Sequence, residues 1–264
     1  MCLIIIAYQA DSRYPLVVAA NRDELYARPT DEANFWTDDP QTQQVLAGRD
    51  LLAGGTWLGI SQGGRFAAVT NIRDPSQTEK KPRSRGELTR NFLVGEESAE
   101  QYCDSLISSF NDFAGYNLLI GDRNSLVYVN NQEEKMSNLE PGVHGLSNGL
   151  LNSPWPKVTQ GRKNLQSLLD DENGVNTDDL ISMMDDRTQA QDEDLPDTGV
   201  PIELERRLSS AFIHNDEGIY GTLCSSAVIF DESGDIRFAE QNYDASGIRT
   251  NSHFYQLLGQ TAAE

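Results

Sequence analysis

The amino-acid sequence predicts an α+β protein in which helices cover β-sheets. Apolar, β-rich segments dominate the first half, paired helical segments follow, and strands return in the last third. A sheet buries its apolar face against another layer, so strand groups separated by paired helices are typical of layered α+β or α/β folds. With 264 residues, no repeat and no low-complexity linker, the whole chain, residues 1–264, is expected to form one domain.

The first two strands are expected to pair as a hairpin. Residues 3–7 and 16–20 are apolar on both faces, which is typical of central strands, and a polar break that contains a proline separates them. If the turn centres between residues 11 and 12, the numbers of facing residues sum to about 23. This register places Cys2 opposite Asn21 and beside the charged run that follows Asn21.

The remaining elements follow from hydrophobic spacing and turn residues. A second hairpin is predicted from a strand at 54–60, a turn at 62–64 and a return strand at 65–70 that ends at Asn71. The other predictions are, in chain order, helices at 86–94 and 99–110, strands at 116–120 and 125–129, helices at 157–169 and 177–184 with Thr177 as N-cap, a mobile surface loop at 185–200, and strands at 222–230, 236–240 and 253–257.

Composition excludes several classes of partner. The chain carries 41 acidic and 21 basic side chains, a formal charge of −20, so nucleic acid is not an expected partner, because binding to phosphate needs Lys and Arg clusters. A mean hydropathy of −0.51 and the lack of any apolar run of about 18 residues predict no integral membrane association. The dispersed acidic surface favours a salt-tolerant source over a docking site for basic partners.

The cysteines and histidines predict neither a disulfide framework nor a metal site. The three cysteines, Cys2, Cys103 and Cys224, cannot all pair and lack zinc-site spacing, which indicates a reducing, cytoplasmic compartment. No short-spaced ligand set exists, so no metal and no required cofactor are expected. The opening residues lack the basic start of a secretion signal and are interpreted as the first strand.

Cys2 is the first candidate for chemistry. If the initiator methionine is removed, Cys2 holds a thiol and its own α-amine, whose reference pKa of about 7.7 to 8.0 lets it take the thiol proton near neutral pH. A neighbouring Arg22 would favour the thiolate, and Asp23 could orient the amine. The alternative is a small buried hydrophobe at the head of a strand.

Four other side chains are candidates of lesser specificity. Asn71 and Asn148 carry uncharged donors suited to an oxyanion hole, although turn chemistry explains most asparagines at strand ends. His144 could act as a general acid, a haem-iron ligand or, the favoured interpretation, a structural hydrogen-bonding group. Arg85 is either ordinary surface charge or an anchor for a substrate carboxylate or propionate.

Several ordered motifs resemble the NRDE family, also called the transport and Golgi organisation protein 2 family. The match runs from residue 1 to beyond residue 220. The motifs include Met1-Cys2-Leu3-Ile4, Ala20-Asn21-Arg22-Asp23-Glu24, Gly54-Gly55-Thr56-Trp57-Leu58-Gly59-Ile60, Thr70-Asn71, Arg85-Gly86-Glu87-Leu88 and Gly145-Leu146-Ser147-Asn148.

This resemblance implies a four-layer αββα sandwich of the N-terminal nucleophile hydrolase type, related to cysteine amidases that cleave penicillin V and bile-acid conjugates. By resemblance, Cys2 matches their nucleophile, Arg22 and Asp23 match a supporting pair that those amidases separate, and Asn71 and Asn148 match the oxyanion residues by chain order. A later arginine of those amidases has no clear equivalent. Candidate substrate-binding residues are Asn21, Trp57, Arg85 and His144.

Two functions from different classes follow. The first is an amidohydrolase or acyltransferase that uses Cys2 on a small-molecule acyl amide or thioester. The second is a non-catalytic cytoplasmic haem-binding or trafficking protein, with His144, Cys2 or Arg85 contacting the porphyrin. The family is linked to secretory-pathway organisation, lipid and acyl-CoA metabolism, and haem trafficking, so the resemblance leaves both open. A purely structural scaffold is a third interpretation.

Overall fold

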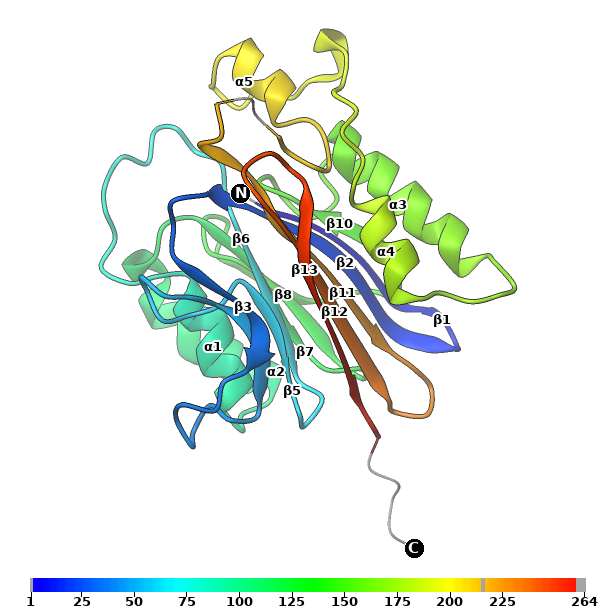
Figure 1. Ribbon diagram of the computed structural model, residues 1–264. Coiled ribbons are helices and arrows are strands. Elements are labelled where there is room, and N and C mark those ends of the chain that lie inside the picture. The colour runs from blue at the N-terminus through cyan, green and yellow to red at the C-terminus, as the bar shows by residue number, and fades with distance from the viewer. Residues whose placement is uncertain (1, 215–216, 260–264) are drawn as a thin grey trace, which may run out of the picture.

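A computed structural model describes residues 2–214 and 217–259, which fold into two antiparallel β-sheets with helices packed against them (Figure 1). The six-stranded sheet has the order β10 (Gly142–Leu146), β1 (Cys2–Asp11), β2 (Tyr14–Leu25), β11 (Tyr220–Phe230), β12 (Ile236–Tyr243) and β13 (Arg249–Leu257). The seven-stranded sheet has the order β3 (Thr30–Phe35), β4 (Val45–Asp50), β5 (Leu58–Ser61), β6 (Phe66–Asn71), β7 (Tyr116–Gly121), β8 (Leu126–Asn130) and β9 (Lys135–Asn138).

The helices belong to two groups. The first group is α1 (Gly86–Val94) and α2 (Ala99–Leu106), which continues as the 3-10 helix η1 (Ile107–Asp112). The second is α3 (Pro156–Leu169) and α4 (Thr177–Met183), and the short α5 (Ile202–Arg207) follows. The predicted N-cap of α4 is wrong by one residue: Asn176, not Thr177, accepts the capping hydrogen bond, from the backbone N–H of Asp179.

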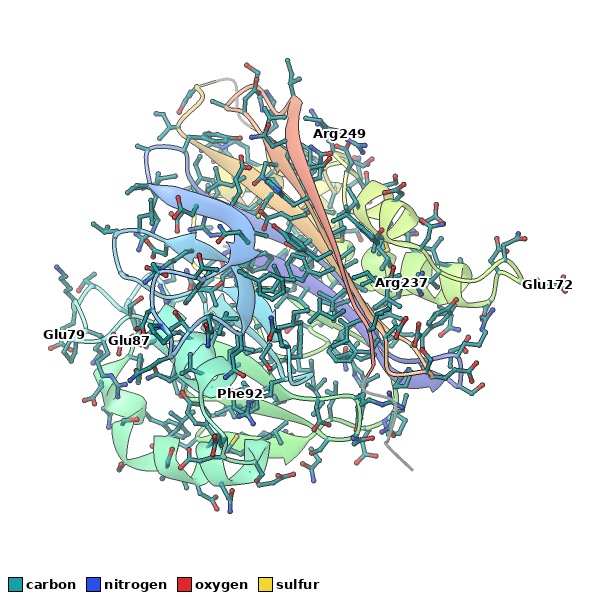
Figure 2. The ribbon with its side chains drawn as sticks, turned by 60° about the horizontal axis from the view of Figure 1, so that its bottom comes forward. Glu79, Glu87, Phe92, Glu172, Arg237 and Arg249 are labelled. Carbon is teal, nitrogen blue, oxygen red and sulfur yellow. The ribbon has the colours of Figure 1, made fainter. Side chains whose placement is uncertain are left out.

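Three buried apolar clusters hold these layers together. One lies between the two sheets and includes Ile4 and Ile6 of β1. A second joins the six-stranded sheet to α3 and α4 and includes Leu3 and Ile5, which point to the opposite face of the same strand. A third packs α1 and α2 on the seven-stranded sheet through residues such as Phe92 (Figure 2). This arrangement confirms the prediction of an α+β protein whose sheets are covered by helices.

The register of the first hairpin corrects the predicted pairing. Cys2 lies opposite Arg22, and Leu3 lies opposite Asn21, so the residue numbers sum to 24 rather than 23. The register shifts between Tyr8 and Asp11, where the backbone of Gln9 adopts a positive φ of 46°. A shift of one residue exchanges the two faces of a strand, so Cys2 shares its face with Arg22 instead of Asn21.

Other predictions missed elements or misplaced their ends. The strands β3, β4, β9 and β10 and the helix α5 were not predicted, because they are short and rich in polar residues or glycine. The strand predicted at 54–60 begins only at Leu58, because residues 54–57 form an irregular loop. Residues 185–200 carry no helix or strand except one 3-10 turn at Asp192–Asp194, as expected for a surface loop.

Within the described ranges, no helix has both the length and the apolar character that crossing a bilayer requires.

Candidate active site

Cys2 belongs to a row of four residues that face one another across the six-stranded sheet. Arg22 lies directly between Cys2 and Cys224, and Cys224 in turn lies opposite Asn242. Directly opposite residues of antiparallel strands project to the same face. The residue two positions after Cys2 on β1 is Ile4, which belongs to the cluster between the sheets. The row therefore faces the inter-sheet space.

A cleft of about 420 Å³ opens at this row. Six residues that the sequence singled out contribute to its lining: Cys2, Arg22, Asp23, Trp57, Asn71 and Arg85. Cys2 retains only 8% of its accessible surface, so its thiol is almost fully desolvated although it borders the cleft.

A close contact between two glycines, Gly55 and Gly86, lies beside the cleft, and Gly86 belongs to its lining. A Cβ atom placed on Gly55 would clash with the backbone of Gly86, so only glycine permits the loop before β5 to lie against the start of α1. Trp57 follows in this loop, and Arg85 immediately precedes the helix. The glycine contact therefore brings Trp57 and Arg85 to one side of the cleft, while Asn71 enters from the end of β6.

Burial controls the acidity of the Cys2 thiol. Desolvation raises the pKa of this thiol above its ordinary value, and the negative charge of Asp23 raises it further, whereas the positive charge of Arg22 lowers it. The thiol form is therefore favoured near neutral pH. Attack on a carbonyl requires a base that removes the proton during the reaction.

Asp23 is held by a buried polar network. Its Oδ1 accepts a hydrogen bond from Thr222 Oγ1 (2.7 Å), and Thr222 Oγ1 accepts one from the backbone N–H of Ile213 (2.8 Å). The hydroxyl of Tyr220 donates to the backbone carbonyl of Asp23 (3.1 Å). Burial raises the pKa of the Asp23 carboxyl, and the positive charge of Lys157 opposes this shift. The network fixes the carboxyl beside Cys2.

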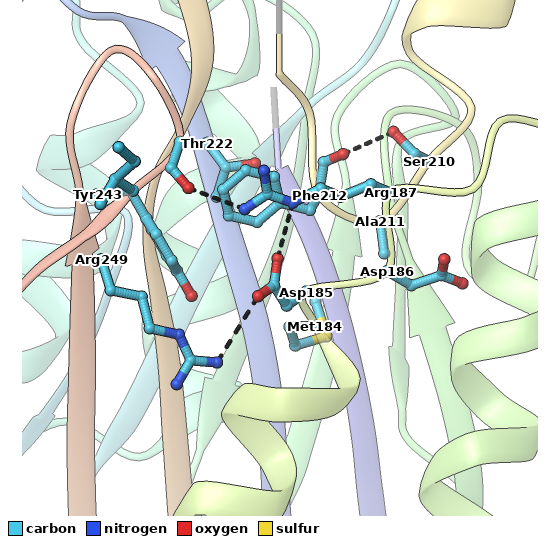
Figure 3. A network of polar contacts seen from close by, with 12 residues as sticks. Met184, Asp185, Asp186, Arg187, Ser210, Ala211, Phe212, Thr222, Tyr243 and Arg249 are labelled. Carbon is cyan, nitrogen blue, oxygen red and sulfur yellow. Dashed lines mark hydrogen bonds and ion pairs between the residues drawn. The ribbon is translucent and has the colours of Figure 1, made fainter.

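The chain that follows α4 and the chain that follows α5, near Met184 and Ala211, pack on the face of β2 opposite the cleft. Figure 3 shows Asp185 between two arginines: Arg187 Nε donates to it (3.0 Å), and a guanidinium nitrogen of Arg249 lies 3.7 Å away. Arg187 also lies over the ring of Phe212, 4.1 Å from its centroid. These contacts hold the chain on both sides of α5 against the sheet.

Asn21, Asn148 and His144 are not among the residues that line the cleft. The amide of Asn21 donates to the backbone carbonyls of Met184 and Ala211, both at 2.8 Å, on the helix-covered face. Asn148 Nδ2 donates to the backbone carbonyl of Asn71 (2.8 Å). His144 contacts the carbonyl of Glu140 and the side chain of Asn152 through its two ring nitrogens. All three side chains hold backbone in place.

The sequence did not identify Lys157 or Glu240 as candidates. Lys157 is 5% exposed, and among the described residues its Nζ has no hydrogen-bond partner. Burial lowers the pKa of Lys157 to about 8, and Asp23 opposes that shift. Glu240 lines the cleft, is 2% exposed and accepts a hydrogen bond from the backbone N–H of Ala33 (2.7 Å). No local pattern marks either residue, because their burial depends on strands distant in sequence.

In the part of the chain that the structure describes, no group of three or more His, Cys, Asp or Glu side chains has the arrangement of a metal site.

The comparisons with known sequences agree on one protein family. A family model described as Transport and Golgi organisation 2 matches residues 1–245. The Transport and Golgi organization protein 2 homolog of Homo sapiens is 31% identical to this chain, over 97% of the chain and 99% of its own length.

Two solved structures share the fold. An N-acylethanolamine-hydrolyzing acid amidase ortholog from Caenorhabditis elegans has a TM-score of 0.52 at 11% identity, covering 86% of this chain and 92% of its own. The C2A mutant of conjugated bile acid hydrolase from Clostridium perfringens has a TM-score of 0.51 at 10% identity, covering 97% and 96%.

Proposed function

We propose that this chain, which belongs to the Transport and Golgi organisation 2 family, is a cysteine amidohydrolase or acyltransferase that acts through Cys2. The observation that carries this proposal is the position of Cys2 at the head of β1, bordering a cleft together with Arg22, Asp23 and Asn71. We further propose that the layers form the four-layer αββα sandwich of N-terminal nucleophile hydrolases. The shared fold of the amidase and bile acid hydrolase structures supports this assignment.

The proposed mechanism begins with removal of Met1, which lies outside the described residues. The α-amine of Cys2 then takes the thiol proton, and the sulfur forms a bond to the carbonyl carbon of an amide or thioester. Asp23 accepts a hydrogen bond from the resulting ammonium group, and the positive charge of Arg22 favours the thiolate. The negative charge that develops on the carbonyl oxygen requires nearby donors.

Asn71 is the proposed donor to this oxyanion, because it lines the cleft at the end of β6. Asn148 would act indirectly, since it donates to the backbone carbonyl of Asn71 and holds that residue in place. Collapse of the intermediate breaks the bond to the leaving group, which takes the proton from the ammonium. Water or an acceptor then attacks the acyl-enzyme and frees Cys2. Trp57 would supply apolar contact for the acyl group.

An acyl-transfer probe tests this mechanism. We expect S-octanoyl-N-acetylcysteamine to leave an octanoyl group on the peptide that contains Cys2, detected by mass spectrometry. Cys2→Ala should abolish this adduct, whereas Cys103→Ala, which changes a buried thiol outside the cleft, should retain it. An adduct that persists in Cys2→Ala, or no adduct on the wild-type chain, would contradict the proposal.

A haem-binding carrier is a second candidate. It is favoured by the presence in one cleft of the Cys2 thiol, the Trp57 indole and four arginines, because a thiolate can ligate haem iron and guanidinium groups can bind propionates. His144 contacts Glu140 and Asn152 and does not line the cleft, so Cys2 is the proposed ligand. Titration with haem should then give a Soret shift that Cys2→Ala removes. An unchanged haem spectrum on addition of the protein would exclude this candidate.

The three unpaired, buried cysteines are consistent with a reducing compartment, and we propose a cytoplasmic location on that basis.

A further inference from the structure

Two arginines that line the cleft have no carboxylate partner among the described residues. Arg22 is only 6% exposed, and its Nη1 donates a hydrogen bond to the hydroxyl of Thr30 (3.0 Å). Arg85 is half-buried, and its Nη1 donates to the backbone carbonyl of Gly115 (3.2 Å). Neither guanidinium group forms an ion pair with a described carboxylate, so both keep donors for a further partner. Burial lowers the pKa of Arg85, and the negative charge of Glu24 opposes this shift without an ion pair between the two side chains.

The other two arginines in the lining are paired. Arg28 lies 2.6 Å from Asp50 and 3.9 Å from Glu24, and Arg49 lies 2.6 Å from Asp38. This difference does not arise from a shortage of acids, because the chain carries 41 acidic side chains for 21 basic ones. Buried charges in proteins are normally paired, since desolvating an unpaired charge is unfavourable.

Four carboxylates in the same lining are engaged by other groups. Glu24 and Asp50 flank Arg28, and Glu32 lies 2.6 Å from the imidazole of His253. Glu240 accepts its hydrogen bonds from the backbone of β3 and from a neighbour on β12. Asp23 and Asp31 also line the cleft: Asp23 accepts a hydrogen bond from Thr222, and Asp31 follows Thr30, the hydrogen-bond partner of Arg22. Arg22 and Arg85 are the arginines of this lining that form no ion pair with a carboxylate of the described residues.

We propose that Arg22 and Arg85 form an anion subsite beside Cys2, and that the substrate carries a carboxylate, sulfonate or phosphate close to its scissile carbonyl. The assignment to a substrate rests on the proposed function. Cys2 and Arg22 are directly opposite on β1 and β2, where Cα atoms lie about 4.5 to 5.5 Å apart, so the anion lies within a few bonds of the carbonyl carbon. Planar guanidinium groups suit such oxyanions because they donate two parallel hydrogen bonds.

Alkylation with a charged and an uncharged reagent tests the subsite without substrate. Iodoacetate and iodoacetamide both form a carbon–sulfur bond with the Cys2 thiolate and release iodide, and the thiol proton goes to the buffer. We expect the ratio of the iodoacetate rate to the iodoacetamide rate to be about tenfold higher at Cys2 than for N-acetylcysteine in the same tube. Arg22→Gln and Arg85→Gln should each remove most of this preference.

Arg49→Gln is the matched control, because it removes a cleft arginine that is already paired with Asp38. Its rate ratio should stay within about twofold of the wild-type ratio. Arg85→Lys keeps the charge but loses the planar fork, and should retain only part of the preference. Equal ratios for Cys2 and N-acetylcysteine, or a preference that survives both glutamine variants, would overturn the subsite.

A binding measurement tests the subsite independently of alkylation, in case neither reagent reaches the Cys2 thiol. In Cys2→Ala, calorimetry should show that N-octanoylglycine binds about tenfold more tightly than N-octanoylglycinamide, and that Arg85→Gln abolishes the difference. N-Octanoyltaurine and O-phospho-N-octanoylethanolamine separate the sulfonate and phosphate classes from the carboxylate. Equal affinity for the charged and uncharged ligands, or no binding of any charged one, would contradict the proposal.

The subsite and the proposed function can fail separately. An octanoyl adduct on Cys2 without any preference for anions would overturn the subsite and leave the catalytic proposal standing. A preference for anions without an acyl adduct would support the subsite as a ligand site and remove the catalytic proposal.

Discussion

Lys157 shows how a single residue near the proposed site lowers stability. Its ammonium group is buried, and Nζ has no hydrogen-bond acceptor among the residues described. Burial lowers its pKa from 10.5 to about 8. Between these pH values the unfolded chain binds more protons at this position than the folded chain does, so the group's contribution to stability rises with pH. Below pH 8 the full destabilisation is present.

Lys157→Met should therefore stabilise the protein at pH 7 by about 1 to 3 kcal/mol, because it replaces a desolvated charge with an apolar chain of similar length. The rise in the free energy of unfolding between pH 8 and pH 10.5 should also flatten. Denaturant unfolding at several pH values measures both effects. Lys163→Met, at an exposed position of the same helix, should change stability by less than about 0.5 kcal/mol. A loss of stability in Lys157→Met would contradict this account.

The loop before β5 packs directly against the start of α1 beside the cleft, through Gly55 and Gly86. Gly55→Ala should destabilise the protein by about 3 kcal/mol or more, since the added methyl group has no space against the backbone of Gly86. Chemical denaturation measures this change. Gly63→Ala is the control: its Cβ would lie 3.6 Å from Ser61 Oγ, and its effect should be small. A loss of stability in Gly55→Ala as small as that in Gly63→Ala would show that the fold does not need this contact.

The sequence predicted elements better than it predicted how their residues point. Alternating or continuous apolar residues located β1, β2 and both helix pairs, because burial on one or two faces leaves a local pattern. The register of the first hairpin was wrong by one residue, since a bulge near Gln9 leaves no such pattern.

The same limit applies to the candidate site. Cys2, Arg22, Asp23 and Arg85 were predicted as site residues, and they border one cleft. Asn148 was predicted as an oxyanion donor, and in the structure it donates to the backbone of Asn71, a contact between segments 77 positions apart. Residues whose environment depends on such distant segments could not be placed by spacing alone.

The whole molecule carries a formal charge of −20, and many of its acidic groups, such as Glu79 and Glu172 in Figure 2, extend into solvent. Like charges on one surface repel, and added salt screens this repulsion over about 10 Å at 0.1 M. The melting temperature should therefore rise as sodium chloride increases from about 0.01 M to 1 M. Differential scanning fluorimetry measures it. A melting temperature that does not rise with salt would show that charge repulsion at the surface does not substantially lower the stability of the fold.

The proposed nucleophile, Cys2, uses its own α-amine as the base, so the mechanism depends on that amine being free. Mass spectrometry of the N-terminal peptide of the purified protein measures whether it is free. This peptide should begin at Cys2 and carry an unmodified amine. A peptide that still carries Met1 would rule out the mechanism, because the proton acceptor would then be an amide nitrogen.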